Sequence, residues 1–328
     1  DILPATQLAI QSGESPQVVV SGNTFVNYLL EDGVLADMAP LAANTGWDIG
    51  NLLQPFQEIK GNTDGTLYSL PYVRSTPLFY YNKTMADAKG LTAPNTVDEM
   101  VEFCRALWTK DGENTSVYGL CILNDFGYIQ AANLYQMGSA YLNEEGTACP
   151  ALDDGAMLKV LSDWRSWIDE GWCSPYDATN AGAVATEMFA QQKLACLVYS
   201  SGGLSTMTKN AADNGFELGV AQYPTYDADK RIAEIGGGNI CIIAEGNTDE
   251  QIAASWEFVQ YLMSDEMVTY NTTMTGYVPT TRSVAEYEGM QKFWEENPLF
   301  KVAYDQVTTG RCQENPYSEY LQDFTQCC

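Results

Sequence analysis

The chain has no histidine and little positive charge. Without histidine it cannot form a Ser-His-Asp or Cys-His nucleophile system, an HExxH zinc site or a histidine general base. Its 16 Lys and Arg residues stand against 43 Asp and Glu, which gives a formal net charge of −27. This charge argues against a nucleic-acid partner and against docking to an anionic membrane face. A small anionic ligand stays open, because one arginine at contact distance can outweigh the global field.

Long apolar runs and metal-type cysteine spacings are also missing. No apolar stretch is long enough to span a bilayer, and none of the nine cysteines forms a CxxC or fits a zinc pattern. Four of them lie in apolar stretches and are predicted to be buried thiols: Cys104, Cys121, Cys196 and Cys241. In an oxidising compartment two disulfides are candidates, Cys149 with Cys173, and Cys312 with Cys327 or Cys328. The odd count leaves at least one thiol free.

The beginning of the chain resembles the interior of a domain. Asp1 starts directly in sequence of the mature type, with no signal peptide. Ile2 to Ile10 is predicted to be helical, and Pro16 to Val20 to be the first strand. An export signal and an opening strand are therefore expected upstream of Asp1.

What is present favours an α/β fold with two lobes. A chain of 328 residues has room for two lobes, and strand-like and helix-like segments alternate along it. Capping boxes begin predicted helices at Thr96 and Thr248, and a third helix runs from about Ala156 to Glu170. In the third helix the predicted apolar side is Leu158, Leu161, Trp164, Trp167 and Ile168. Predicted strands are Val18–Val20, Leu78–Tyr81, Ala195–Tyr199, Leu218–Ala221 and Ile240–Ala244.

The segment from Ser69 to Lys83 is the most informative part of the chain. It places Tyr72, Arg74, Ser75 and Thr76 between two extended apolar runs, and Pro71 and Pro77 stiffen its backbone. Small hydroxyl donors flanked by rings suit a polyhydroxylated ligand. An ordinary buried strand after a turn explains the same residues equally well.

Other motifs are weaker singly. Ser200-Ser201-Gly202-Gly203 follows a strand and precedes a helix, so it is either an anion or hydroxyl site or a plain helix cap. Thr275–Thr281 is a turn carrying Tyr277, and Gly310–Pro316 is a polar loop carrying Arg311. No P-loop, GxSxG or GxGxxG motif is present, and the calcium-like runs at Asn62–Thr66 and Asp227–Asp229 are interpreted as turns. No cofactor or metal is therefore predicted.

Taken in order, these segments resemble the extracellular solute-binding proteins of carbohydrate-type ABC importers, most closely the glycerol-3-phosphate-binding branch. The motifs are Pro-Gln-Val-Val-Val, Ser-Thr-Pro-Leu-Phe-Tyr-Tyr-Asn-Lys, Ser-Ser-Gly-Gly-Leu, Gly-Gly-Gly-Asn and Thr-Gly-Tyr-Val-Pro-Thr-Thr, from about Pro16 to Pro316. The resemblance implies a periplasmic-binding-protein fold, with two α/β lobes, a multi-strand hinge and a ligand cleft between the lobes. It implies closure on the ligand, delivery to permease subunits, and no enzymatic activity.

The resemblance also implies site residues. Ser75 and Thr76 match the binding segment, Ser201 with Ser200 the binding hydroxyls, and Gly238 the glycine whose backbone approaches the ligand. Tyr277 matches the ring of Thr-Gly-Tyr, and Arg311 matches the phosphate-binding arginine, five positions before Pro316.

This chain departs from the branch at two of these positions. Asn23 stands where the branch has an acidic residue, and Tyr128 stands where it has a tryptophan, in Asn124–Tyr128. An aromatic residue of the family's N-terminal part is not in the sequence. The departures at Asn23 and Tyr128 leave the choice of ligand open.

We interpret the chain as the binding component of an ABC importer, exported and tethered outside the cell as a lipoprotein. Its ligand is expected to be glycerol-3-phosphate, a glycerophosphodiester or a small sugar, with Arg311 on the phosphate and Tyr128 or Phe126 covering the ligand. A neutral oligosaccharide-binding protein of the same fold, a carboxylate-based glycosidase and a sensory binding domain are the alternatives. The resemblance assigns residues 1–103 and 236–285 to the first lobe, and 104–235 and 286–328 to the second.

Overall fold

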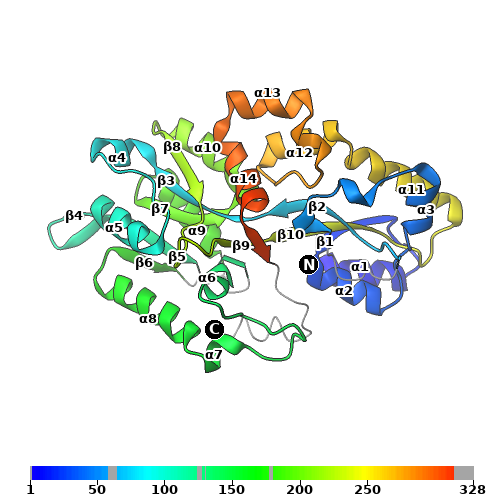
Figure 1. Ribbon diagram of the computed structural model, residues 1–328, viewed down its shortest axis with the longest axis horizontal. Coiled ribbons are helices and arrows are strands. Elements are labelled where there is room, and N and C mark those ends of the chain that lie inside the picture. Colours follow the sequence, from blue (N-terminus) through cyan, green and yellow to red (C-terminus); the bar gives the residue numbers. More distant parts are fainter. Residues whose placement is uncertain (1, 58–64, 124–127, 130, 177–179, 314–328) are drawn as a thin grey trace. The chain divides into compact units, whose positions relative to one another are not determined.

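The computed structural model describes residues 2–57, 65–123, 128–129, 131–176 and 180–313 (Figure 1). The chain divides into two compact units, unit 1 with residues 1–75 and 236–297, and unit 2 with residues 76–235 and 298–328. It therefore passes between the units three times, after Ser75, Ile235 and Asn297. No helix in the described part of the chain combines the length and the apolar character needed to cross a membrane.

Unit 1 is built on a three-stranded antiparallel sheet of order β1-β10-β2, formed by Val18–Gly22, Gly236–Ile242 and Leu70–Ser75. Its helices are α1 (Ile2–Gln11), α2 (Asn23–Glu31), α3 (Ala39–Thr45), α11 (Asp249–Leu262), α12 (Asp265–Thr275) and α13 (Glu288–Glu296), with short 3₁₀ turns at Ile49–Asn51, Gln54–Phe56 and Ser283–Ala285.

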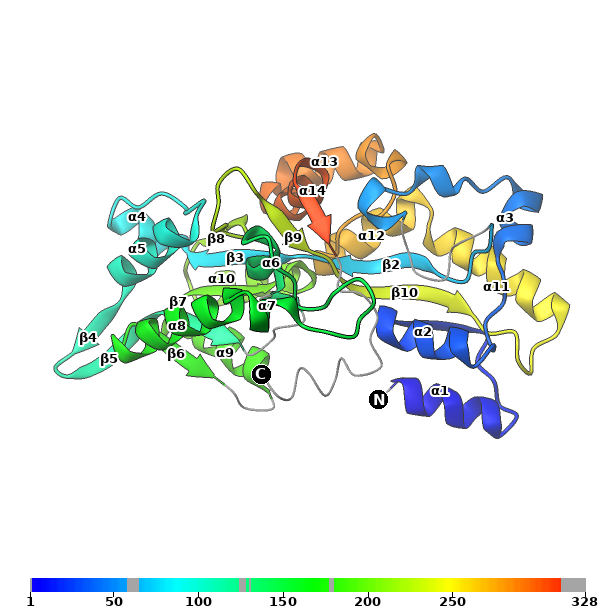
Figure 2. The same cartoon turned by 60° about the horizontal axis from the view of Figure 1, so that its bottom comes forward.

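Alternation along β1 and β10 gives unit 1 a core on each face of its sheet. Ile240 and Ile242 pack on one face with Trp256 and Val259 of α11. Cys241 and Ile243 pack on the other face with Val26 and Leu29 of α2. The alternation follows from the two-residue repeat of a strand, which turns successive side chains to opposite faces. The placement of α2 and α11 can be followed in Figure 2.

Unit 2 contains a mixed sheet of order β4-β5-β7-β3-β8, with β6 added beside β5. Its strands are β3 (Pro77–Asn82), β4 (Thr109–Asp111), β5 (Asn114–Leu123), β6 (Cys173–Tyr176), β7 (Leu194–Ser200) and β8 (Leu218–Gln222), and β9 (Ile232–Glu234) forms a separate parallel pair with β11 (Arg311–Gln313). Its helices are α4 (Lys83–Ala88), α5 (Val97–Leu107), α6 (Ala131–Gln136), α7 (Pro150–Asp153), α8 (Ala156–Asp169), α9 (Ala181–Ala190), α10 (Leu204–Asp213) and α14 (Lys301–Thr309), with 3₁₀ turns η4 (Ser201–Gly203) and η6 (Pro298–Phe300).

Several sequence predictions are confirmed at the level of single elements. The capping boxes at Thr96 and Thr248 are both formed and begin α5 and α11. Each of the five predicted strands overlaps an observed strand. The segment from Ser69 to Lys83 forms two successive strands, β2 and β3, and the two units divide between them at Ser75 and Thr76.

Helix α8 buries Trp164 and Trp167, as predicted. Leu158 and Leu161 are 69% and 42% exposed, so their assignment to the apolar side was wrong. Met157 and Val160, one position earlier in each case, are buried in their place. One position is about 100° around the helix, and it puts Met157 and Val160 on the same side as the two tryptophans.

The predicted lobe boundaries differ from the observed units at two of three points. The boundary between 235 and 236 coincides with the observed one. Residues 76–103 lie in unit 2 because β3 pairs there with both β7 and β8. Residues 286–297 lie in unit 1, where α13 packs on α12.

The predicted disulfide between Cys149 and Cys173 is wrong. Cys173 is a free, buried thiol, and its electrostatic neighbours are Cys121 and Cys104. It begins β6, whose register places it opposite Leu120 of β5, inside the sheet. Cys312 is also a free thiol, and its predicted partners Cys327 and Cys328 lie outside the described residues.

Cys104, Cys121, Cys196 and Cys241 are buried free thiols, as predicted. Burial raises the pKa of the Cys121 and Cys241 thiols to about 12. In the unfolded chain a thiol ionises near pH 8.5. The stability that these protonated thiols contribute is therefore complete below about pH 8.5 and is lost as the pH rises towards the folded-state pKa.

We predict that iodoacetamide at pH 8 leaves Cys121 and Cys241 unmodified in the native protein, because the thiolate is the reacting form and burial suppresses it. The same reagent should alkylate both fully in urea. Peptide mass spectrometry measures the two rates, and equal rates in native and unfolded protein would contradict the buried placement.

Gly237 occupies a position that only glycine fits. Its φ is +97°, and a Cβ there would lie 2.0 Å from the Val73 carbonyl oxygen of β2. Gly238 has ordinary backbone, and its Cβ would meet the Ser21 carbonyl oxygen and Val73 Cγ2, each at 3.1 Å. The pairing of β10 with β2 shifts register just after Gly238. The glycine run therefore allows three strands to approach closely where β10 begins.

We predict that Gly237→Ala lowers the melting temperature well below that of Gly33→Ala. Gly33 also has a positive φ, +70°, but a Cβ added there would have no atom within 4 Å. Gly33→Ala should lower the free energy of unfolding by about 1 kcal/mol, from left-handed backbone strain alone. Gly237→Ala should lower it by about 2 kcal/mol more, because the added Cβ overlaps the neighbouring strand. Circular dichroism melting compares them, and equal losses would show that the overlap is relieved.

Candidate ligand-binding site

In unit 1 the strand register brings four predicted site residues to one end of the sheet. Gly22 of β1 pairs with Gly238 of β10, and Asn23 follows Gly22 as the first residue of α2. Ser75 of β2 pairs with Gly236. Tyr277 is next to Val278, which bridges to Arg74 of β2, and its ring is half-buried. Residues distant in sequence therefore meet where β1 ends and β10 begins.

Arg74, although it lies in the most informative segment, supports the fold of unit 1. Its side chain is 2% exposed. Its Nη1 donates to Asn239 Oδ1 at 3.1 Å, and its guanidinium lies over the Phe56 ring at 5.6 Å from the centroid. A guanidinium engaged in this way stabilises the unit around β10 and is not presented to solvent.

In unit 2 the Thr76 and Ser201 side chains are wholly buried and already hydrogen-bonded. Thr76 N donates to Ser201 Oγ at 3.2 Å, and Ser201 N donates to Thr76 O at 2.9 Å. The Thr76 hydroxyl donates to the Glu234 carbonyl at 2.8 Å and accepts from Gln306 Nε2 at 2.7 Å. These hydroxyls therefore position the surrounding segments, and a ligand would have to displace existing bonds to reach them.

Ser200 and Tyr128 are the more accessible members of the unit 2 set. Both side chains are half-buried, and Tyr128 Oη lies 3.4 Å from Ser200 Oγ. Ser200 Oγ also accepts from Gly202 N at 3.2 Å, so Ser200 caps η4. Tyr80, wholly buried, donates from its hydroxyl to the Ser200 carbonyl at 2.9 Å. The predicted cover residue Phe126 lies outside the described residues.

Arg311 is exposed and lies on β11 opposite Ile232 of β9. The neighbouring cation, Arg231, is half-buried, and its Nη1 donates to the Tyr223 carbonyl at 2.7 Å while Nη2 contacts Asn95. Desolvation lowers the pKa of Arg231. Of these two guanidiniums, Arg311 is the one presented to solvent.

Gln306 of α14 links the β9–β11 pair to Thr76, the residue between β2 and β3. Gln306 Nε2 donates to Thr76 Oγ1 at 2.7 Å and to the Pro77 carbonyl at 2.8 Å, and its Oε1 accepts from Tyr223 N at 2.7 Å. Helix α14 leads directly into β11. Arg311, Ser200 and Ser201 are thus parts of one hydrogen-bonded framework within unit 2.

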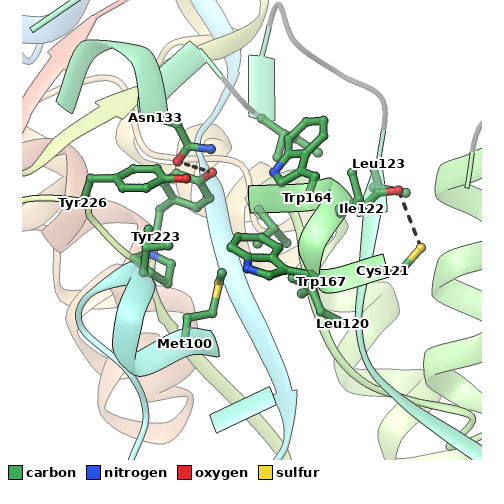
Figure 3. A pocket seen from close by; sticks show the side chains of 14 residues that line it. Met100, Leu120, Cys121, Ile122, Leu123, Asn133, Trp164, Trp167, Tyr223 and Tyr226 are labelled. Atoms are coloured by element: carbon green, nitrogen blue, oxygen red, sulfur yellow. Dashed lines mark hydrogen bonds between the residues drawn. The ribbon is translucent and has the colours of Figure 1, made fainter. Parts of the chain in front are cut away.

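A small aromatic pocket is lined by Tyr223, whose amide donates to Gln306 (Figure 3). In the view, Trp164 and Trp167 of α8 stand between Tyr223 and Tyr226 on one side and Leu120–Leu123 of β5 on the other. Its volume is about 30 Å³, which leaves room for about two water molecules. A sugar or glycerol phosphate does not fit this volume, so we assign the pocket to the core of unit 2.

The described residues contain no group of three or more Cys, Asp or Glu side chains arranged to hold a metal ion. The Asp227–Asp229 run forms a turn, as predicted, in which Asp229 N donates to Asp227 Oδ1 at 3.0 Å. Lys230 forms an ion pair with Asp227 at 3.0 Å and lowers the pKa of its carboxyl.

Sequence reasoning missed two residues near the predicted set. Gly237, next to the predicted Gly238, has the left-handed backbone, and it is exposed where Gly238 is buried. Tyr199 immediately precedes Ser200, and its ring is half-buried. A tyrosine that ends an apolar strand directly before Ser-Ser-Gly-Gly was the available signal.

Comparison with known proteins is consistent with this arrangement. The chain matches the model of the family "Bacterial extracellular solute-binding protein" over residues 1–302. It is 26% identical over 248 residues to the sn-glycerol-3-phosphate-binding periplasmic protein UgpB of Rhizobium meliloti, covering 72% of this chain and 54% of that protein. It is 28% identical over 258 residues to UgpB of Yersinia pestis, covering 74% and 55%. The chain thus spans about half the length of these curated relatives.

Solved structures share the fold. UgpB from Mycobacterium tuberculosis, in complex with glycerophosphocholine, superposes with a TM-score of 0.83 at 23% identity, covering 99% of this chain and 79% of that one. The GacH receptor of Streptomyces glaucescens, solved unliganded and with acarbose, superposes with a TM-score of 0.80 at 20% identity and the same coverage. These matches confirm the predicted α/β periplasmic-binding-protein fold.

The family model covers most of the chain, and the fold of the two units agrees with it. The family consists of receptors that bind solutes and carry out no reaction on them. The protein therefore belongs to the bacterial extracellular solute-binding proteins.

Proposed function

We propose that this protein is the solute-capturing component of an ABC importer and that its solute is a small phosphorylated polyol, either glycerol-3-phosphate or a glycerophosphodiester. The observation that carries this proposal is Arg311, an exposed arginine on β11 of unit 2, the unit that also carries the accessible hydroxyls of Ser200 and Tyr128. The relatives named as glycerol-3-phosphate-binding proteins, and the related structure with glycerophosphocholine, point to the same class of solute.

Charge makes Arg311 the deciding residue. The chain has a formal net charge of −27, so an anionic solute approaches against the overall field. Two opposite unit charges in contact near a protein surface attract each other by about 4 kcal/mol. The repulsion from distant acidic residues is weaker, because salt screens it. The planar guanidinium can also bind two phosphate oxygens at once.

The remaining polar groups suit the hydroxyls of the solute. Ser200 and Tyr128 offer neutral donors and acceptors in unit 2. Asn23, Tyr277 and the Gly237–Gly238 backbone are the corresponding groups of unit 1. Ser75, Thr76 and Ser201 are buried, and we propose that they hold their segments in place.

A neutral oligosaccharide is the second candidate. It is favoured by the neutral hydroxyl and ring character of Ser200, Tyr128 and Tyr277, which does not require a phosphate. The fold is also shared with a receptor solved with acarbose. If the solute is an oligosaccharide, Arg311 plays no part in binding.

For either solute, we propose that the loaded protein docks to permease subunits and that a lipid tether holds it outside the cell.

We predict that Arg311→Ala weakens the binding of glycerol-3-phosphate or glycerophosphocholine about 100-fold, because a charge-assisted pair in a closed site contributes on the order of a few kcal/mol. Isothermal titration calorimetry against both compounds and maltotriose measures this. Arg165→Ala is the matched control, since Arg165 is exposed on α8 and its loss changes the net charge equally. Arg165→Ala should bind as the wild type does.

Failure of the wild type to bind either phosphate compound, or equal binding by wild type and Arg311→Ala, would eliminate the phosphorylated solute. Binding of maltotriose alone, unaffected by Arg311→Ala, would establish the oligosaccharide version instead.

A further inference from the structure

Tyr199 differs from the rest of its strand. It is the sixth residue of β7 (Leu194–Ser200), and the five residues before it are all buried. Its own ring is half-buried, and it directly precedes Ser200, the accessible hydroxyl of the unit 2 set. An aromatic ring that becomes accessible at the end of a buried strand stands where α/β proteins place their ligands.

Two glycines from different segments lie beside opposite edges of this ring. A Cβ on Gly182, in the first turn of α9, would lie 3.1 Å from Tyr199 Cε2 and 3.3 Å from its hydroxyl oxygen. A Cβ on Gly203, at the end of η4, would lie 3.0 Å from Cε1 and 3.2 Å from Cδ1. Even an alanine at either position would press on the ring.

Backbone conformation does not explain these two glycines. Gly203 has φ −95°, which any residue adopts, and Gly182 is not among the positive-φ residues. A glycine inside a helix also lowers stability by up to about 1 kcal/mol relative to alanine. The space taken by the Tyr199 ring accounts for both glycines, because a Cβ at either position would crowd the ring.

Two other phenol groups, Tyr80 and Tyr128, contact Ser200, the residue after Tyr199. Burial raises the pKa of Tyr80, and Tyr128 and Tyr199 raise it further. Tyr80 is engaged with the Ser200 carbonyl and Tyr128 with Ser200 Oγ. Tyr199 therefore adds a second aromatic ring beside Ser200, next to that of Tyr128.

We propose that Tyr199 contacts the bound solute and determines which solutes fit beside Ser200. This inference rests on the proposed solute-binding function and adds a residue to that site. The ring provides a flat apolar surface for the C–H face of a polyol, and its bulk limits the size of the solute that fits beside Ser200. Gly182 and Gly203 are positioning residues that act through the ring.

The test compares the affinities of five variants for glycerol-3-phosphate and for the larger glycerophosphocholine. Tyr199→Ala should weaken the better-bound compound roughly tenfold or more and change the ratio of the two affinities, since a size limit acts differently on the two. Tyr199→Phe keeps the ring and should retain that ratio. Gly182→Ala and Gly203→Ala should each change the ratio in the same direction, although neither removes the ring.

Tyr118→Ala serves as the matched control, because Tyr118 is a half-buried tyrosine on β5 of the same sheet and belongs to neither set. It should leave both affinities unchanged. Thermal melting of each variant without ligand separates a loss of stability from a loss of affinity, and the affinity ratio does not depend on the folded fraction.

The outcomes distinguish a failure of the proposed function from a failure of the proposed role of Tyr199. A wild type that binds neither compound overturns the proposed function and this inference with it. A wild type that binds, with an unchanged affinity ratio in Tyr199→Ala and in both glycine variants, overturns the role of Tyr199 and leaves the proposed function standing.

Discussion

The architecture of unit 2 depends on the hydrogen bonds made by one buried residue, Thr76. Its amide, carbonyl and hydroxyl bond to Ser201, Glu234 and Gln306, which lie 125 to 230 residues later in the sequence. The start of β3, the turn η4, the end of β9 and helix α14 are thereby joined at a single point. Because these groups are buried, replacing the Ser201 or Gln306 side chain leaves an unsatisfied donor or acceptor in the interior, which costs about 1 to 3 kcal/mol.

This junction has a direct consequence for recognition. The hydroxyls that lie deepest in the motif-bearing segments, Thr76 and Ser201, are used by the fold itself. What remains accessible around them is Ser200, Tyr128, Tyr199 and the guanidinium of Arg311. The protein thus uses its buried hydroxyls to hold accessible groups in register, which is the preorganisation that selective binding of a small solute requires.

Glycine makes room in both units, in two different ways. Gly237 combines a left-handed backbone with a close approach to the Val73 carbonyl, so the strand ends of unit 1 can converge. Gly182 and Gly203 have ordinary backbone and make room for the ring of Tyr199. The net negative charge of the chain repels all anions alike. Selectivity for one anion therefore has to come from the packing that these glycines allow and from one well-placed cation.

Local signals in the sequence determined the elements and their ends. The capping boxes at Thr96 and Thr248 are satisfied within one turn of helix, so they could be predicted without knowledge of the rest of the chain. The family motifs likewise indicated the fold. What could not be predicted depends on packing. In α8, Met157 is buried and Leu158 is exposed, because Met157 lies on the same side of the helix as the buried Trp164 and Trp167.

The same distinction applies to the candidate site. The sequence by itself determined which residue types stand in the motif segments, namely Ser200, Ser201, Thr76, Tyr277 and Arg311. Only the tertiary structure decided that Thr76 and Ser201 are buried and bonded while Ser200 and Arg311 are accessible, and that Cys173 lies among thiols other than Cys149. The physical reason is that burial and hydrogen bonding depend on partners more than a hundred residues away, which no local pattern of residues specifies.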